Sequence, residues 1–164
     1  MRQMTYSNTF RTQGLYCRDV LIRCMDFRFH AALEQGLRDL LAYEGGFECF
    51  DSPGAGGGGS KAIIDERSRE VVFAALNLAM EKHEASRIVV ADHIDCAAYG
   101  GSGLHQDAAA EERFHAERLQ EAYDILRETY PSLQIVPVYQ DWETIKQVDM
   151  VIVRPSRPPV PRKA

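Results

Sequence analysis

Short apolar runs alternate along this chain with longer segments whose apolar residues recur at helical spacing. The runs Val20-Leu21-Ile22 and Ile88-Val89-Val90-Ala91 are continuous and short, a pattern typical of buried strands. The pattern as a whole predicts strands at about 19–24, 47–51, 87–92, 133–139 and 148–153. It also predicts helices at about 31–43, 60–83 and 107–129, each with an apolar stripe on one face.

Strands that alternate with helices predict an α/β domain with a central, mostly parallel β-sheet flanked by helices. With the strands numbered along the chain, we expect the order 2-1-3-4 and a further edge strand. A chain of 164 residues is expected to form a single domain. Its flanks are interpreted as an N-terminal arm at 1–17 and a proline-rich, basic tail at 155–164.

Composition and charge exclude some classes of partner. A formal net charge of -5 argues against nucleic acid, because phosphate binding needs a basic surface. No apolar run approaches the length of a membrane span, and the first residues lack the apolar core of a signal peptide. We therefore expect a cytoplasmic protein without a membrane partner. In that reducing compartment the four cysteines do not predict a disulfide framework.

Two stretches carry the candidate chemistry, and each follows a predicted strand. Cys24-Met25-Asp26-Phe27-Arg28 follows the first strand, and His93-Ile94-Asp95-Cys96 follows the third. If the first stretch is extended, its thiol, carboxylate and guanidinium leave the chain on one side. Two sulfurs and an imidazole are ligands that zinc prefers, and three protein ligands leave a fourth position open, as in catalytic sites. The order 2-1-3-4 brings both stretches to the point where the strand order reverses, the usual ligand site of such sheets.

These residues resemble the β-class carbonic anhydrases, whose motifs are Cys-x-Asp-x-Arg, a short Ala-Gly loop and His-x-x-Cys. The loop corresponds to Ala55-Gly56 here, and the resemblance covers most of the chain in element order. It implies the fold of that family and one zinc ion per chain, bound by Cys24, His93 and Cys96. It also implies that Asp26 and Arg28 are the catalytic pair, and that the chain forms a homodimer or a higher homo-oligomer. The implied activity is reversible hydration of carbon dioxide to bicarbonate by a zinc-bound hydroxide.

Several positions depart from the pattern of that family, and three of them lie in or beside the metal-ligand motifs. Phe27 stands where serine is usual, and Asp92 and Ala97 stand where glycine is usual. Together with Ala55 and Gly56, Phe27 and Ala97 are candidates for lining the pocket. Two alternatives therefore stay open beside carbon dioxide hydration. One is a hydrolase of the same fold that acts on carbonyl sulfide or carbon disulfide, and the other is a catalytically silent binding module stabilised by zinc.

The glycine run at 54–59 and the remaining histidines have weaker interpretations. The run fits G-x-G-x-x-G, but a dinucleotide site also needs an acidic residue about 20 positions later, at the end of the next strand. The next predicted strand ends near Asp92, which comes too late. We expect a close-packed backbone loop instead. His30 and His105 flank the motif segments and are candidate proton relays. His83 and His115 are predicted to lie on helices as surface or packing residues.

Overall fold

A computed structural model describes residues 16–42, 50–51 and 59–151. The strands are β1 (Asp19–Arg23), β2 (Phe50–Asp51), β3 (Arg87–His93), β4 (Gln134–Gln140) and β5 (Ile145–Gln147). The helices are α1 (Phe27–Leu40), α2 (Gly59–Ile64), α3 (Glu66–His83) and α4 (Ala108–Thr129), with two short 3-10 turns at Ala97–Tyr99 and Ser102–Leu104. None of the helices in these ranges is long and apolar enough to span a membrane.

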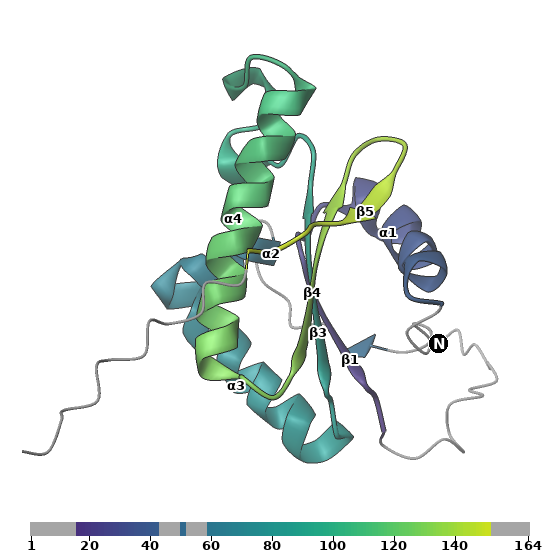
Figure 1. The fold of residues 1–164 in the computed structure, drawn as a ribbon, viewed down its shortest axis with the longest axis vertical. Helices are drawn as coiled ribbons and strands as arrows, with labels where there is room; N and C mark the ends of the chain where they lie inside the picture. Colours follow the sequence, from purple (N-terminus) through teal and green to yellow (C-terminus); the bar gives the residue numbers. More distant parts are fainter. Residues whose placement is uncertain (1–15, 43–49, 52–58, 152–164) are drawn as a thin grey trace, which may run out of the picture.

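The strands form one sheet in the order β2-β1-β3-β4-β5, which confirms the predicted order (Figure 1). The pairs β1–β2, β1–β3 and β3–β4 are parallel, whereas β4 and β5 are antiparallel. The sheet is therefore mixed, and the expectation of a mostly parallel sheet does not hold at this edge.

The last strand predicted at 148–153 is wrong over 148–151, and residues 152 and 153 lie outside the described residues. The edge strand is β5, and residues 148–151 belong to no strand. The cause is a tight turn after β4, in which the Asp141 carboxylate accepts hydrogen bonds from the backbone N–H groups of Glu143 and Thr144. This turn brings Ile145 back beside Gln140 at once, so pairing begins earlier than the apolar run at 148–153 indicates.

Alternate residues of the strands build two layers, one on each face of the sheet. Helix α1 covers one face, and α2, α3 and α4 cover the other (Figure 1). The α1 layer contains every second strand residue together with three leucines of the α1 segment: Leu21, Val89, Ala91, Val136, Val138, Leu33, Leu37 and Leu41. The residues between them, including Ile22, Ile88 and Val90, pack against the other helices. Both faces are buried, which explains the continuous apolar runs.

Two helix boundaries differ from the prediction, and an aspartate is the reason in each case. Helix α1 begins at Phe27 rather than near 31, because the Asp26 side chain caps its N-terminus. The helix predicted at 60–83 is two helices, since Asp65 caps α3 by accepting from the N–H groups of Arg67 and Ser68. Asp107 caps α4 as expected for the helix at 107–129.

Gly59 is the one member of the glycine run among the described residues. A Cβ atom there would lie 2.5 Å from the Ile22 carbonyl oxygen and 2.6 Å from that of Ala91. Only glycine lets the start of α2 approach β1 and β3 so closely. The close-packed backbone predicted for the run is thus confirmed at Gly59, while Ala55 and Gly56 lie outside the described residues.

Candidate metal centre

The three predicted ligands come together at the carboxyl ends of β1 and β3. The ligand atoms of Cys24, His93 and Cys96 all lie within 4.8 Å of one another. All three residues are buried, with exposed fractions of 8%, 4% and 1%. Cys24 follows β1, His93 ends β3, and Cys96 follows a turn in which Asp95 has a left-handed backbone (φ 56°). This turn returns the second thiol toward the first.

The His93 ring is oriented so that one nitrogen remains available. Its Nδ1 lies 2.7 Å from the backbone carbonyl oxygen of Ile94, which identifies Nδ1 as the donor. Its Nε2 is buried and has no hydrogen-bond partner among the residues that the structure describes. Phe29 stacks on the ring with the centroids 4.2 Å apart. A metal ligand needs such a fixed ring with a free lone pair, so His93 fits this role.

The pKa shifts of Cys96 and His93 are also consistent with a site for a bound cation. The close Cys24 side chain and burial raise the pKa of Cys96 far above the usual value for a thiol. Burial lowers the pKa of His93, but the Cys24 side chain and the Ile94 carbonyl outweigh burial and raise it overall. Two thiolates this close therefore need a compensating positive charge, and a divalent metal supplies one.

Asp26 and Arg28 lie beside the ligands, but not on an extended segment as predicted. Asp26 is the N-cap of α1, and Arg28 belongs to its first turn. The guanidinium binds the carboxylate through Nε, 3.0 Å from both oxygens, and through Nη2, 2.6 Å from Oδ2. The hydrogen bonds from Arg28 outweigh the effect of burial and lower the pKa of Asp26 to about 2. Asp26 is therefore an anion at neutral pH.

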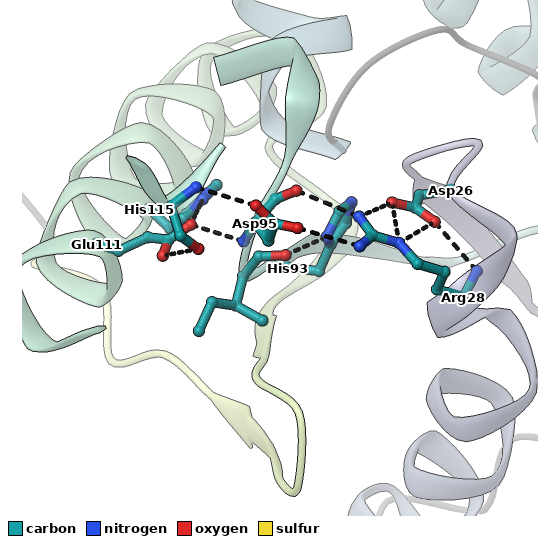
Figure 2. Close-up of polar contacts among 8 residues, drawn as sticks. Asp26, Arg28, His93, Asp95, Glu111 and His115 are labelled. Carbon is teal, nitrogen blue, oxygen red and sulfur yellow. Dashed lines mark hydrogen bonds and ion pairs between the residues drawn. The ribbon is translucent and has the colours of Figure 1, made fainter. Parts of the chain in front are cut away.

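Arg28 also binds a second carboxylate that the sequence analysis did not assign. Its Nη1 lies 3.0 Å from Asp95 Oδ2, so the guanidinium bridges Asp26 and Asp95 (Figure 2). The N–H of Ser102 donates to Asp95 Oδ1, and the N–H of Asp95 donates to Glu111 on α4 at 2.6 Å. Glu111 is buried and also accepts from the Ser102 hydroxyl. The Asp26–Arg28 pair, which lies beside the predicted metal ligands, is thus connected to α4 through Asp95 and Glu111.

Asp92 belongs to a buried polar cluster on the other face of the sheet. Its carboxylate accepts from the backbone N–H of Ser60 at 2.8 Å and from the Ser60 hydroxyl at 2.5 Å. It also lies 3.1 Å from His115 Nδ1, and His115 Nε2 lies 4.0 Å from Glu111. The Tyr99 hydroxyl lies 2.9 Å from that of Ser60. His115 is therefore more than the surface or packing residue predicted, because it lies between two buried carboxylates.

A small cavity adjoins the ligand set. Its lining residues come from β1, the link from β1 to α1, α1, β3 and β4: Arg23, Cys24, Asp26, Phe29, His30, Leu33, Ala91, Asp92, His93 and Gln140. Phe27 and Ala97, expected to line the pocket, are absent from this set. Phe27 is 82% exposed, because the first turn of α1 directs Phe29 inward instead. Gln140 also lines a wider groove of about 530 Å³ between α1 and the β4–β5 hairpin.

The two histidines predicted as proton relays lie in different surroundings. His30 lines the cavity, and its Nε2 is 3.0 Å from the Cys24 carbonyl oxygen. His105 packs against Phe114 at a centroid distance of 5.1 Å. Their relay roles remain predictions.

An α/β domain with a buried two-cysteine, one-histidine set at the strand ends has the features of a metalloprotein. The family model described as "Putative carbonic anhydrase" matches residues 16–151, and the chain belongs to this family. An uncharacterized protein of Rickettsia conorii is 29% identical over 122 residues, covering 71% of this chain and 63% of that protein. An uncharacterized protein of Rickettsia bellii is 25% identical over 122 residues, covering 71% of each chain. No solved structure matches the chain significantly.

Proposed function

We propose that this protein is a zinc-dependent carbonic anhydrase that catalyses the reversible hydration of carbon dioxide to bicarbonate. The observation that carries the proposal is the buried convergence of Cys24, His93 and Cys96 with an anionic Asp26 at the same cavity. Membership of the family supports the same reaction.

The ligand set would hold zinc, and zinc supplies a Lewis acid that lowers the pKa of a water molecule at an open coordination position. Asp26 lines the cavity and remains ionised, so it can accept a hydrogen bond from a hydroxyl group there. Arg28 fixes the direction of that carboxylate through its three contacts from Nε and Nη2. Asp95 holds Arg28 from its other side and keeps it in place.

The decisive experiment is a stopped-flow hydration assay on protein loaded with zinc. Carbonyl sulfide and carbon disulfide are tested alongside, because they are also small, linear and uncharged. Carbon dioxide turnover well above that of buffer supports the proposal. Turnover of only a sulfur compound favours the hydrolase alternative, and no turnover at full zinc occupancy favours the silent binding module.

We also propose that the protein acts as a homodimer or larger homo-oligomer. Met25 and Phe27 flank Asp26 and are 73% and 82% exposed, so the mouth of the site presents apolar surface. Sedimentation equilibrium of the zinc-loaded protein tests this. A monomer at micromolar concentration would contradict it.

A further inference from the structure

Gln140 ends β4, and its backbone lies directly beside His93 in the sheet. Within β3 and β4, the residues two and four positions earlier pack toward α1: Val89, Ala91, Val136 and Val138. Because side chains alternate along a strand, the Gln140 and His93 side chains leave the sheet on that same face. The carboxamide is thus placed next to a predicted metal ligand.

The backbone of one residue, Ile94, also links Gln140 and His93. The backbone N–H of Ile94 donates to the Gln140 carbonyl oxygen at 2.9 Å. The carbonyl oxygen of Ile94 accepts from His93 Nδ1. The backbone of Gln140 and the ring of His93 are therefore fixed relative to each other.

The Gln140 side chain is buried, but one of its polar atoms lacks a hydrogen-bond partner among the described residues. The residue is 4% exposed, and its Oε1 atom has no hydrogen-bond partner among the described residues. It lines the same cavity as Cys24, Asp26 and His93. A buried oxygen without a partner is costly and rare in folded proteins. Its place in this cavity indicates a ligand that supplies a hydrogen.

We propose that Gln140 is a substrate-binding residue whose Oε1 accepts the hydroxyl hydrogen of bicarbonate. The inference rests on the proposed function, in which bicarbonate is product and reverse substrate. Carbon dioxide carries no hydrogen, so this contact distinguishes bicarbonate from carbon dioxide. Nitrate has the same planar shape and charge as bicarbonate but no hydroxyl group. Gln140 therefore favours bicarbonate over nitrate.

The test uses cobalt(II) in place of zinc and follows the visible absorption of the metal during titration with bicarbonate and with nitrate. In Gln140→Met, which keeps side-chain length, we expect bicarbonate affinity to fall about tenfold and nitrate affinity to stay within about twofold. Gln147→Met is the matched control, since Gln147 is exposed on β5, and it should change neither affinity. An unliganded cobalt spectrum equal to that of the unchanged protein shows that the ligand set is intact.

Unchanged bicarbonate affinity in Gln140→Met, or an equal loss for both anions, overturns the inference. Gln140→Glu is a second variant, because a carboxylate at this position repels both anions. If it weakens neither, Gln140 does not face the bound anion. A hydration rate no faster than that of buffer would refute the proposed function. The anion titration of the cobalt-loaded protein would still decide whether Gln140 binds bicarbonate.

Discussion

Asp95 Oδ2 lies 3.0 Å from Arg28 Nη1, although the two residues belong to motifs that are 67 positions apart. Asp95 thus holds the same guanidinium that orients Asp26. In Asp95→Asn, the amide keeps an acceptor for the Ser102 N–H but loses the charge that attracts Arg28. We expect hydration activity to fall about tenfold at full zinc occupancy. Asp124→Asn, at an exposed position on α4, is the control and should retain full activity.

The ligand assignment predicts the metal content of two serine variants. Cys96→Ser replaces a thiolate with a poor zinc ligand, so we expect the zinc content of purified protein to fall well below one ion per chain. Cys17→Ser should keep its zinc, because Cys17 lies before β1, where its thiol contacts the Asp19 carbonyl oxygen. Elemental analysis after dialysis measures both. Full occupancy in Cys96→Ser would refute the assignment.

The pH dependence of activity should not come from Asp26. Arg28 lowers the folded-state pKa of Asp26 to about 2, below its ordinary value of 3.8. The interaction therefore stabilises the fold above pH 3.8 and is lost only as the pH falls toward 2. Asp26→Asn should reduce hydration by the same factor at every pH between about 6 and 9. A ratio that changes across this range in stopped-flow assays would show that Asp26 titrates there.

Replacing Asp92 with glycine, the residue usual in the β-class carbonic anhydrases that the motifs resemble, should destabilise the protein. Asp92→Gly leaves the Ser60 hydroxyl and His115 without their buried partner and adds backbone freedom to β3. We expect a loss of about 2–4 kcal/mol in the free energy of unfolding. Urea denaturation measures it, and Asp124→Asn is again the control. A loss below about 0.5 kcal/mol would contradict the importance of this cluster.

Gly59→Ala should destabilise the folded protein for a steric reason. The new Cβ would meet backbone atoms of β1 and β3, which cannot move aside as a side chain can. We expect a loss of more than about 2 kcal/mol, measured by thermal unfolding of zinc-loaded protein. Gly103→Ala is the matched control, because nothing lies within 4 Å of a Cβ at that position. Equal melting temperatures for the two variants would contradict the close approach of α2.

The sequence predicted those parts of the fold that depend on local pattern. Buried strands such as β1 and β3 give continuous apolar runs, and Asp107 directly precedes a helical stripe. The start of β5 could not be read in this way, since Ile145–Gln147 has only one apolar residue. Asp65 is a residue type that caps helices, so the sequence did contain an indication of the break between α2 and α3. The apolar stripe of the predicted helix at 60–83 continues across Asp65, however, and therefore favoured a single helix.

The candidate site was predictable to the same extent. Its three predicted metal ligands come from two short motifs, and the sheet order brings these together. The role of Glu111 depends on the contact of α4 with the turn after β3, which no local pattern encodes. The sequence signal of Gln140 was weak, since it is a polar residue directly after the apolar strand predicted at 133–139, and its burial is known only from the structure. That Gln140 lies beside His93 became evident only from the register of β3 and β4.

The alternation of β3 directs the side chains of consecutive residues toward opposite layers of the protein. The His93 imidazole lies among the predicted metal ligands, while the Asp92 carboxylate, one position earlier, binds Ser60 and His115 of the opposite layer. Substitutions in α2, and at positions of α4 other than Glu111 and His115, can thus alter the stability of the protein without reaching the residues at the strand end. Drift along α1 and the β4–β5 hairpin can reshape ligand preference on the same scaffold. Relatives with similar motifs can therefore diverge in stability and in selectivity along separate evolutionary routes.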